Sequence, residues 1–451
     1  MSSVDARRLR ICAVGAGSST HIASRVRWFA ERGHRVFLLT TSPSPAGIPG
    51  VTEVDLSAAP LVSAEASLLG AGRRCRDWCR SRLAHSRGRL ETGQERTPAE
   101  ASTTAEPSRR PVREGVHRVL TALDFLFALR RCKPDVVHVH YAYGEHAWLT
   151  ALFGCRPLVV TVMGGDVLFE EQGSPTAAGR WLTVRLLRQA DYLTTQSHLL
   201  SATVNRLGAF ENKNERVLWG VPLDTFRRRD ATSLRLALGL KPESRVVLSA
   251  KILQPFYRVH LVVEAMAQVR ESFPDAVLVV TEYLADPAYR EQIQRRVAEL
   301  DLREHVVFGG VLTDDEMPDL YSLSTVSIAV PPSDGMPQAL LESLACETPQ
   351  ILTRLSRYEE LVRHEESAYF VDPNPDSIAA GITRLLEDDD LRCRIARQGR
   401  RVVEEQANLD EQAARVEHRL RELAATTQPR TFRLSALLAA AAAYASRQRS
   451  A

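Results

Sequence analysis

Short apolar runs alternate with amphipathic stretches along most of this chain, and this alternation restricts its fold more than any other feature. The first cycle comprises an apolar run at residues 8–14, helical spacing from Ile22 to Ala30, and a second apolar run at residues 35–40. Apolar runs of about four to eight residues between turn signals are typical of buried strands. Strands that alternate with helices predict parallel pairing, because parallel strands need a long crossover connection. We therefore expect an α/β protein.

The alternation occurs in two series. In the first series a helix is expected at about residues 114–132, with further strands at 134–140, 157–163, 192–195 and 216–219. A polar linker is expected at residues 224–230, and the second series then has strands at 246–250, 276–280, 305–308 and 326–330. Helices are expected at about residues 260–270, 287–300 and 410–423, and another is expected to begin at the capping box formed by Thr313 and Glu316.

The length of the chain also favours two domains. Single cores seldom grow beyond roughly 250 to 300 residues, and this chain has 451. We predict two Rossmann-like domains with doubly wound parallel sheets that face an interdomain cleft. The predicted boundaries are residues 1–225 for the first domain, 226–425 for the second and 426–451 for a tail.

The bulk composition excludes several classes of protein. With 44% hydrophobic and 25% charged residues the chain is ordinarily globular, and its net charge of +3 is too small for an extended nucleic-acid footprint. The seven cysteines are odd in number and irregularly spaced, which favours reduced thiols in a cytoplasmic protein over a disulfide framework. We find no signal-peptide pattern and no apolar run of the roughly 20 residues that a membrane span needs.

One segment departs from the alternating pattern. Residues 60–113 lose their periodicity and contain a cluster of seven arginines between residues 73 and 89. Two interpretations stay open. The segment is either a solvated, mobile insertion, which we favour, or an amphipathic patch that makes peripheral contact with an anionic membrane.

The most informative local sequence is PPSDGMPQALLESLACETP at residues 331–349, directly after an expected strand. Its Pro, Ser, Asp and Gly cluster predicts a sharp loop, and a helix should begin near Gln338. Asp334 then lies at the helix entrance, where free backbone N–H groups favour an anion or a hydroxyl-rich ligand. Glu342 lies about 140° from the centre of the apolar stripe and should point away from the core. The stripe consists of Leu340, Leu341, Leu344 and Ala345. The two carboxylates either flank one pocket or are ordinary solvated groups.

Other candidates lie near the ends of the strands expected in the first series, where parallel sheets carry their chemistry. Gly15 and Gly17 follow the first strand, but the third glycine of a dinucleotide fingerprint is missing. We expect these two glycines to bind the donor through a close approach of their backbone to it. His140, His146 and Asp166 are candidates for the cleft. A single histidine is more often structural than functional, so these two histidines are residues to test.

Taken together, these motifs make the chain resemble the retaining nucleotide-sugar glycosyltransferases of family 4, which have the GT-B fold. The resemblance covers about residues 8–50 and 113–425. Its most specific part is Ser333–Pro337 followed by Leu340–Cys346, which is similar to the paired-carboxylate motif of the family. Supporting matches are Gly33-His34, Lys133–His138, Gly164–Asp166, Asp191 with Ser197, Gly220-Val221 with Asp224 and Phe226, and Phe308-Gly309.

The resemblance assigns roles in binding the donor. It implies that Asp334 contacts hydroxyls of the donor sugar and that Glu342 accepts hydrogen bonds from the ribose. The backbone of the segment Gly335, Met336 and Pro337 would lie against sugar and phosphate. Lys251 and Arg258 would correspond to the basic pair of the family, which stabilises the charge that develops on the departing diphosphate.

The implied reaction is transfer of a hexose from a UDP- or GDP-linked sugar to an acceptor hydroxyl, with retention of configuration. The acceptor, which would be a glycan, a lipid-linked or a small molecule, would be held mainly by the first domain and the donor by the second. The chain departs from the family pattern at Asp334, where Glu is commoner, at Glu347, where Gly is usual, and at Met163, where a histidine often stands. No general base can therefore be named by analogy.

We expect catalysis without a metal, because no Asp-x-Asp motif falls at a strand end, and no cofactor beyond the co-substrate. Two alternatives stay open. One is a nucleotide-sugar epimerase, which would form product from the donor alone. The other is a nucleotide-sugar-binding protein whose catalytic site has decayed.

Overall fold

The computed structural model describes residues 7–57, 110–169, 176–208, 210–313, 315–433, 435–436 and 439. Most of the arginine-rich insertion and of the C-terminal tail lies outside these residues. The chain forms two compact units. Unit 1 consists of Met1–Arg7, Val139–Gly144 and Leu158–Thr427, and unit 2 of Arg8–His138, Glu145–Pro157 and Gln428–Ala451.

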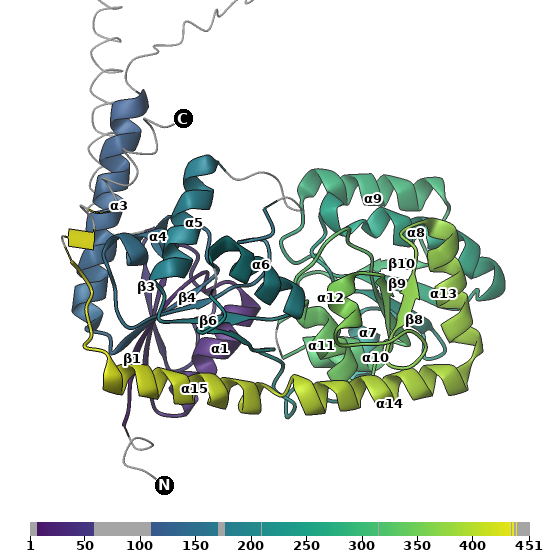
Figure 1. Cartoon of the computed structure of the whole chain (residues 1–451). Coiled ribbons are helices and arrows are strands. Elements are labelled where there is room, and N and C mark those ends of the chain that lie inside the picture. The colour runs from purple at the N-terminus through teal and green to yellow at the C-terminus, as the bar shows by residue number, and fades with distance from the viewer. Residues whose placement is uncertain are drawn as a thin grey trace, which may run out of the picture. The chain divides into compact units, whose positions relative to one another are not determined.

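The strands form two sheets (Figure 1), and every strand pair whose register is defined is parallel. The first sheet has the order β3-β2-β1-β4-β5-β6-β7. Its strands are β1 (Arg10–Val14), β2 (Arg35–Thr40), β3 (Val51–Asp55), β4 (Val136–His140), β5 (Leu158–Thr161), β6 (Tyr192–Thr195) and β7 (Asn214–Arg216). The helices of this half are α1 (Thr20–Glu31), α3 (Arg110–Cys132), α4 (Glu145–Leu152), α5 (Ala177–Gln189) and α6 (His198–Gly208).

The second sheet lies entirely in unit 1 and has the order β10-β9-β8-β11-β12-β13. Its strands are β8 (Arg245–Ser249), β9 (Ala276–Val280), β10 (Val306–Phe308), β11 (Val326–Ala329), β12 (Gln350–Thr353) and β13 (Tyr369–Val371). Its helices are α7 (Thr232–Ala237), the 3-10 turn η1 (Pro255–Tyr257), α8 (Val259–Ser272), α9 (Pro287–Glu299), α10 (Met317–Leu323), α11 (Gln338–Ala345), α12 (Ser356–Glu359) and α13 (Pro375–Glu387). Two long helices follow, α14 (Asp389–Gln406) and α15 (Leu409–Thr426). The expected fold class, two Rossmann-like parallel sheets with interleaved helices, is confirmed.

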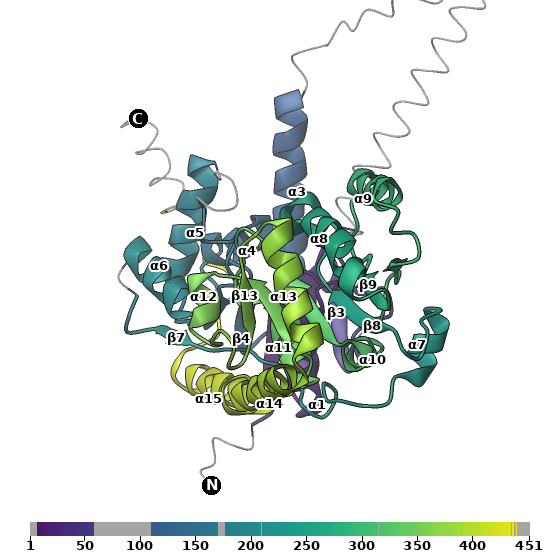
Figure 2. The same ribbon diagram turned by 90° about the vertical axis from the view of Figure 1, so that its right-hand side faces the viewer.

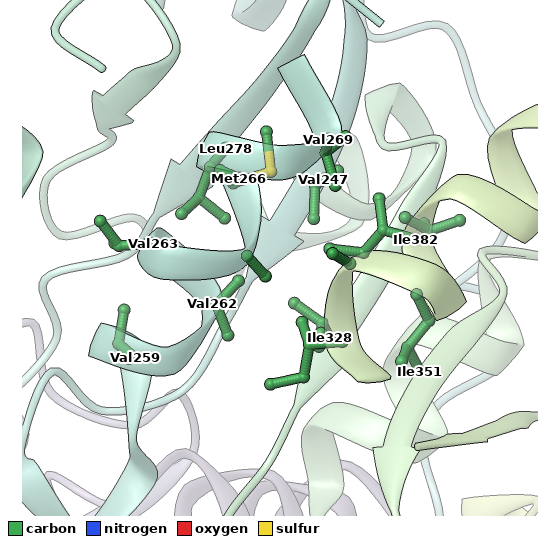
Figure 3. Packing of buried hydrophobic residues seen from close by; sticks show 14 of the residues in the cluster. Val247, Val259, Val262, Val263, Met266, Val269, Leu278, Ile328, Ile351 and Ile382 are labelled. Atoms are coloured by element: carbon green, nitrogen blue, oxygen red, sulfur yellow. The ribbon is translucent and has the colours of Figure 1, made fainter. Parts of the chain in front are cut away.

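Both faces of the second sheet are buried, which explains why its strands are continuously apolar rather than alternating. On one face α8 and α13 lie side by side (Figures 1 and 2) and pack on the strands through residues such as Val262, Met266 and Ile382 (Figure 3). On the other face α10 and α11 pack through Leu320 and Leu344. The sheet is thus a rigid base for the loops at its strand ends.

Several local predictions differ from the structure. The capping box bond forms, because the Glu316 carboxylate accepts from the Thr313 N–H at 2.8 Å, but the helix begins only at Met317. The strand expected at residues 216–219 ends at Arg216. The strands β3, β12 and β13 were not predicted. No helix among the described residues has both the length and the apolar character that crossing a membrane requires.

Candidate functional site

The predicted paired carboxylates lie on consecutive parts of the chain, Asp334 in the loop between β11 and α11 and Glu342 on α11. α11 begins at Gln338, as predicted, and buries the apolar stripe of Leu340, Leu341, Leu344 and Ala345. Pro337 is the N-cap residue and supplies no side-chain hydrogen bond to the helix. Proline has no backbone N–H, and it is tolerated at the start of a helix because an N–H group there would have no partner within the helix. This explains why the helix starts directly after Pro337. The loop is thereby held at the carboxyl end of β11.

Lys251 and Asp334 form the centre of the site. They follow β8 and β11, which are neighbouring parallel strands. The Lys251 ammonium lies 2.6 Å from Asp334 Oδ2, and the two side chains are 10% and 18% exposed. The hydroxyl of Tyr358, a fully buried residue, donates to the same oxygen at 3.0 Å. The structure thus brings together the two residues that the sequence assigned to the phosphate and the sugar.

The second oxygen of this carboxylate, Asp334 Oδ1, receives no recorded hydrogen bond from any residue that the structure describes. An ionised carboxylate can accept at both oxygens. Asp334 therefore has one oxygen fixed by protein donors and one that can accept from a ligand.

Arg258 lies between η1 and α8 in the left-handed backbone conformation, with φ 55° and ψ 35°. Its backbone N–H donates to Pro255 O at 3.1 Å. Within the described parts of the chain, no ion pair or hydrogen bond is recorded for its guanidinium. Arg258 is thus the residue that immediately precedes α8, and it brings a positively charged side chain to this position.

Glu342 is less exposed than its position on the helix predicts. It is half-buried, and its Oε2 accepts a hydrogen bond from the hydroxyl of the fully buried Tyr321 at 3.2 Å. Burial first, and the Glu342 charge second, raise the pKa of Tyr321, so this phenol stays a donor. The glutamate therefore lies partly against the core beside α10 instead of pointing fully outward.

Asp166 is completely buried. Its Oδ2 accepts from the Ala142 N–H at 2.7 Å, and its Oδ1 accepts from the Gly164 N–H at 2.8 Å and the Met163 N–H at 3.1 Å. Burial raises its pKa, and the backbone hydrogen bonds oppose that shift. These hydrogen bonds favour a role of Asp166 in fixing the loop after β5. A contact between Asp166 and the acceptor stays a prediction.

Within unit 1, the loop after β5 meets the loop between β11 and α11, which carries Asp334 and is called the carboxylate loop below. A Cβ atom on Gly335 would lie 2.5 Å from the Met163 carbonyl oxygen, which is closer than real Cβ contacts come. Gly164 has φ +132°, a conformation that side chains rarely adopt. Glycine is therefore needed at both positions, and the backbone of Gly335 lies against the strand-end loop as a result.

The other candidates are distributed over both units. In unit 1, His140 is buried and its ring centroid lies 6.1 Å from that of Trp219. In unit 2, Gly17 N–H donates to Thr40 Oγ1 at 3.1 Å, and Gly15 N–H donates to Leu39 O at 3.2 Å. His146 packs against Phe125, and burial lowers its pKa. The functional roles of these residues stay predictions.

The tyrosines that hold the two carboxylates were not predicted from the sequence. Tyr321 lies on α10 and Tyr358 on α12, far from their partners in sequence. Tyr358 follows β12, so the rule that chemistry gathers at strand ends would have favoured it had that strand been identified. Among the described residues, no group of three His, Cys, Asp or Glu side chains is placed to hold a metal ion.

Two family models match this chain. The model described as "Glycosyl transferases group 1" matches residues 230–402, and the model described as "Glycosyl transferase 4-like domain" matches residues 16–220. The first of these spans Lys251, Arg258, Asp334 and Glu342.

Individual relatives agree with the family models. A putative glycosyltransferase YtcC of Bacillus subtilis is 26% identical over 52% of this chain and 60% of its own length. The N-acetyl-alpha-D-glucosaminyl L-malate synthase of Bacillus anthracis is 24% identical over 60% of this chain and 70% of its own. Against the first of these, the chain matches less than two thirds of the relative's length.

Among solved structures, the fold is similar to that of Anabaena Alr3699/HepE in complex with UDP and glucose. The TM-score is 0.67 and the sequence identity 14%, with 92% of this chain and 100% of that chain covered. At this identity the similarity concerns the fold. From the two family models and the two parallel sheets, we conclude that the chain belongs to the group 1, family 4-like glycosyltransferases with the GT-B fold.

Proposed function

We propose that this protein transfers a sugar from a nucleoside-diphosphate sugar, UDP- or GDP-linked, to an acceptor hydroxyl with retention of configuration. The observation that carries the proposal is the contact between Lys251 and Asp334 at the carboxyl ends of adjacent parallel strands. Such strand ends are where open α/β sheets bind their ligands.

The cations suit a diphosphate leaving group. A lysine ammonium has three donors, and one of those of Lys251 is directed to Asp334. The remaining two can serve phosphate oxygens. Arg258 adds a second charge near the start of α8. Preorganised positive charge of this kind stabilises the negative charge that develops as the glycosidic bond breaks.

The carboxylates suit the hydroxyl-bearing ends of the donor. Asp334 has an oxygen that can accept from a sugar hydroxyl. Glu342, whose Oε2 accepts from the Tyr321 hydroxyl, supplies the carboxylate proposed for the ribose. The HepE structure contains UDP and glucose, which makes UDP-glucose the first donor to test. The five described cysteines are free thiols, which supports a cytoplasmic location.

The experiment begins with a thermal-shift screen of UDP-, GDP- and ADP-sugars, because a donor that binds the folded state raises its apparent stability. Turnover of the best donor is then measured with a panel of acceptors. We expect Lys251→Ala to reduce kcat/KM by at least about 100-fold, the usual loss when one charge-stabilising group is removed. Glu342→Ala should reduce kcat/KM by at least about tenfold, because the ribose loses its charged hydrogen-bond acceptor. Proton NMR of the first product should show the anomeric configuration of the donor.

Two exposed residues beside β8 provide matched controls. Lys241→Ala and Glu243→Ala remove the same charges outside the site and should leave turnover unchanged. Wild-type turnover in both site variants would overturn the assignment. Conversion of the donor with no acceptor present would indicate the epimerase instead, and tight donor binding without any conversion would indicate a binding protein.

A further inference from the structure

The short segment formed by β12 and α12 braces the carboxylate loop at three places. The Thr353 hydroxyl donates to Pro331 O at 3.0 Å, and the Arg357 guanidinium donates to Ser333 Oγ at 3.3 Å. The third bond is the one from the Tyr358 hydroxyl to Asp334 Oδ2. Two hydrogen bonds from α12 and one from β12 therefore stabilise the conformation of the loop around Asp334.

The two donors on Asp334 Oδ2 differ in how well they fix it. Lys251 supplies a compact charge on a flexible stem, which tolerates rotation of the carboxylate. Tyr358 supplies a hydroxyl on a rigid ring, and the residue is 0% exposed. Its backbone carbonyl also accepts from Leu361 N and Val362 N, both at 2.9 Å. The tyrosine is thus the more rigid of the two partners.

The phenol can act only as a donor toward this carboxylate. Burial first, and the neighbouring Asp334 charge second, raise the pKa of Tyr358 well above its ordinary value. The hydroxyl therefore keeps its proton and occupies a lone pair of Oδ2. With Oδ2 held by two donors, the other oxygen is the one left for an incoming hydroxyl.

We propose that Tyr358 is a positioning residue that orients Asp334, so that Oδ1 is presented to one hydroxyl of the donor sugar and contributes to the choice of sugar. This inference rests on the proposed function. By the same geometry Tyr321 positions Glu342, which serves the nucleotide end of the donor. The two tyrosines therefore predict different kinetic effects.

The test compares Tyr358→Phe with Tyr321→Phe, since each variant loses one hydroxyl and keeps its ring. Tyr358→Phe should reduce kcat/KM for the donor by roughly tenfold, the effect of one hydrogen bond to a charged group. Its affinity for free UDP or GDP, measured by calorimetry, should change by less than about twofold. Tyr321→Phe should instead weaken the affinity for the free nucleoside diphosphate.

Deoxy-sugar donors give a readout that a purely structural role would not affect. For the donor that lacks the hydroxyl bound by Asp334, wild type and Tyr358→Phe should have nearly equal kcat/KM. For the other deoxy donors the tenfold difference should persist. An equal loss with every deoxy donor, or a parallel loss of nucleoside-diphosphate affinity, would overturn the inference.

Ser333→Ala provides a second route if Tyr358→Phe does not fold. This substitution removes the hydroxyl that accepts from Arg357 in the same brace. The reduction in kcat/KM that it causes should depend on the same sugar hydroxyl. A uniform loss over all donors would count against the brace. If the wild-type protein binds and converts no nucleoside-diphosphate sugar, the proposed function has failed; a converting wild type with an unaffected Tyr358→Phe refutes this inference alone.

Discussion

The ion pair between Lys251 and Asp334 lies in the proposed donor site, and its loss should also affect stability. Both side chains are largely buried, at 10% and 18% exposed. Removal of one partner from a buried pair leaves an uncompensated charge and typically costs about 3 to 5 kcal/mol. Loss of activity in Lys251→Ala can therefore reflect lower stability as well as a missing contact with the donor. Glu342→Ala is the comparison, because the hydrogen-bond partner that it leaves behind, Tyr321, is neutral.

His138 on β4 should control part of the stability at low pH. Burial, with a smaller contribution from Arg25, lowers its pKa to about 3. The folded pKa lies below the unfolded value, so the stability present above about pH 6.5 is lost as the pH falls toward the folded pKa. The slope from this one group should reach about 1.4 kcal/mol per pH unit.

We expect His138→Val to flatten the dependence of the unfolding free energy on pH between about 6.5 and 4. The measurement is urea unfolding at a series of pH values. His418, an exposed residue on α15, is the control, and His418→Ala should keep the wild-type slope. Parallel slopes for His138→Val and wild type would contradict the prediction.

At the scale of elements, the sequence predicts several of the strands whose environment is uniform. β6 and β9 are buried at every position and have the predicted bounds. β3 is an edge strand in which Thr52 is exposed and the other residues are half-buried, so neither a continuous run nor a clear alternation marks it. Uniform burial does not suffice by itself, because β12 is also buried at every position and was not predicted.

The same contrast applies to the site. The loop before α11 with Asp334, and the position of Glu342 on α11, follow from turn residues and helical spacing, which are local. The pairing of Lys251 with Asp334 depends on the order of the strands, and the bonds from Tyr321 and Tyr358 depend on how α10 and α12 pack. Strand order and helix packing are set by tertiary contacts that periodicity does not encode.

The start of α8 allows stability and activity to be separated. Arg258 holds a left-handed conformation there, with φ 55°, which costs a residue other than glycine about 1 kcal/mol. Arg258→Gly should therefore be more stable than Arg258→Ala by about that amount. Both variants lose the guanidinium, so both should lose turnover to the same extent.

The Arg258 comparison needs two measurements, the unfolding free energy by denaturant and kcat/KM with the same donor. Equal stability of the two variants would mean that the backbone conformation is not strained. Activity retained in the more stable glycine variant would mean that the guanidinium does not serve the diphosphate.

At the scale of the whole molecule, the charged groups assigned to the donor all belong to one compact unit. Unit 1 contains Lys251, Arg258, Asp334 and Glu342, whereas the two glycines assigned to the donor, Gly15 and Gly17, belong to unit 2 with His146. Donor affinity should consequently depend first on the lysine, the arginine and the two carboxylates. Substitution of His146 is better read through acceptor-dependent turnover.

The source of positive charge decides how the whole enzyme should respond to chelation. A divalent cation often neutralises a departing diphosphate, whereas the function proposed here assigns that charge to Lys251 and Arg258. We expect turnover in excess EDTA to stay within about twofold of turnover in Mg²⁺. Lys251→Ala should be impaired by about 100-fold in both conditions. Activity that EDTA abolishes and Mg²⁺ restores, or a Lys251→Ala variant that Mg²⁺ rescues, would show that a metal carries this charge instead.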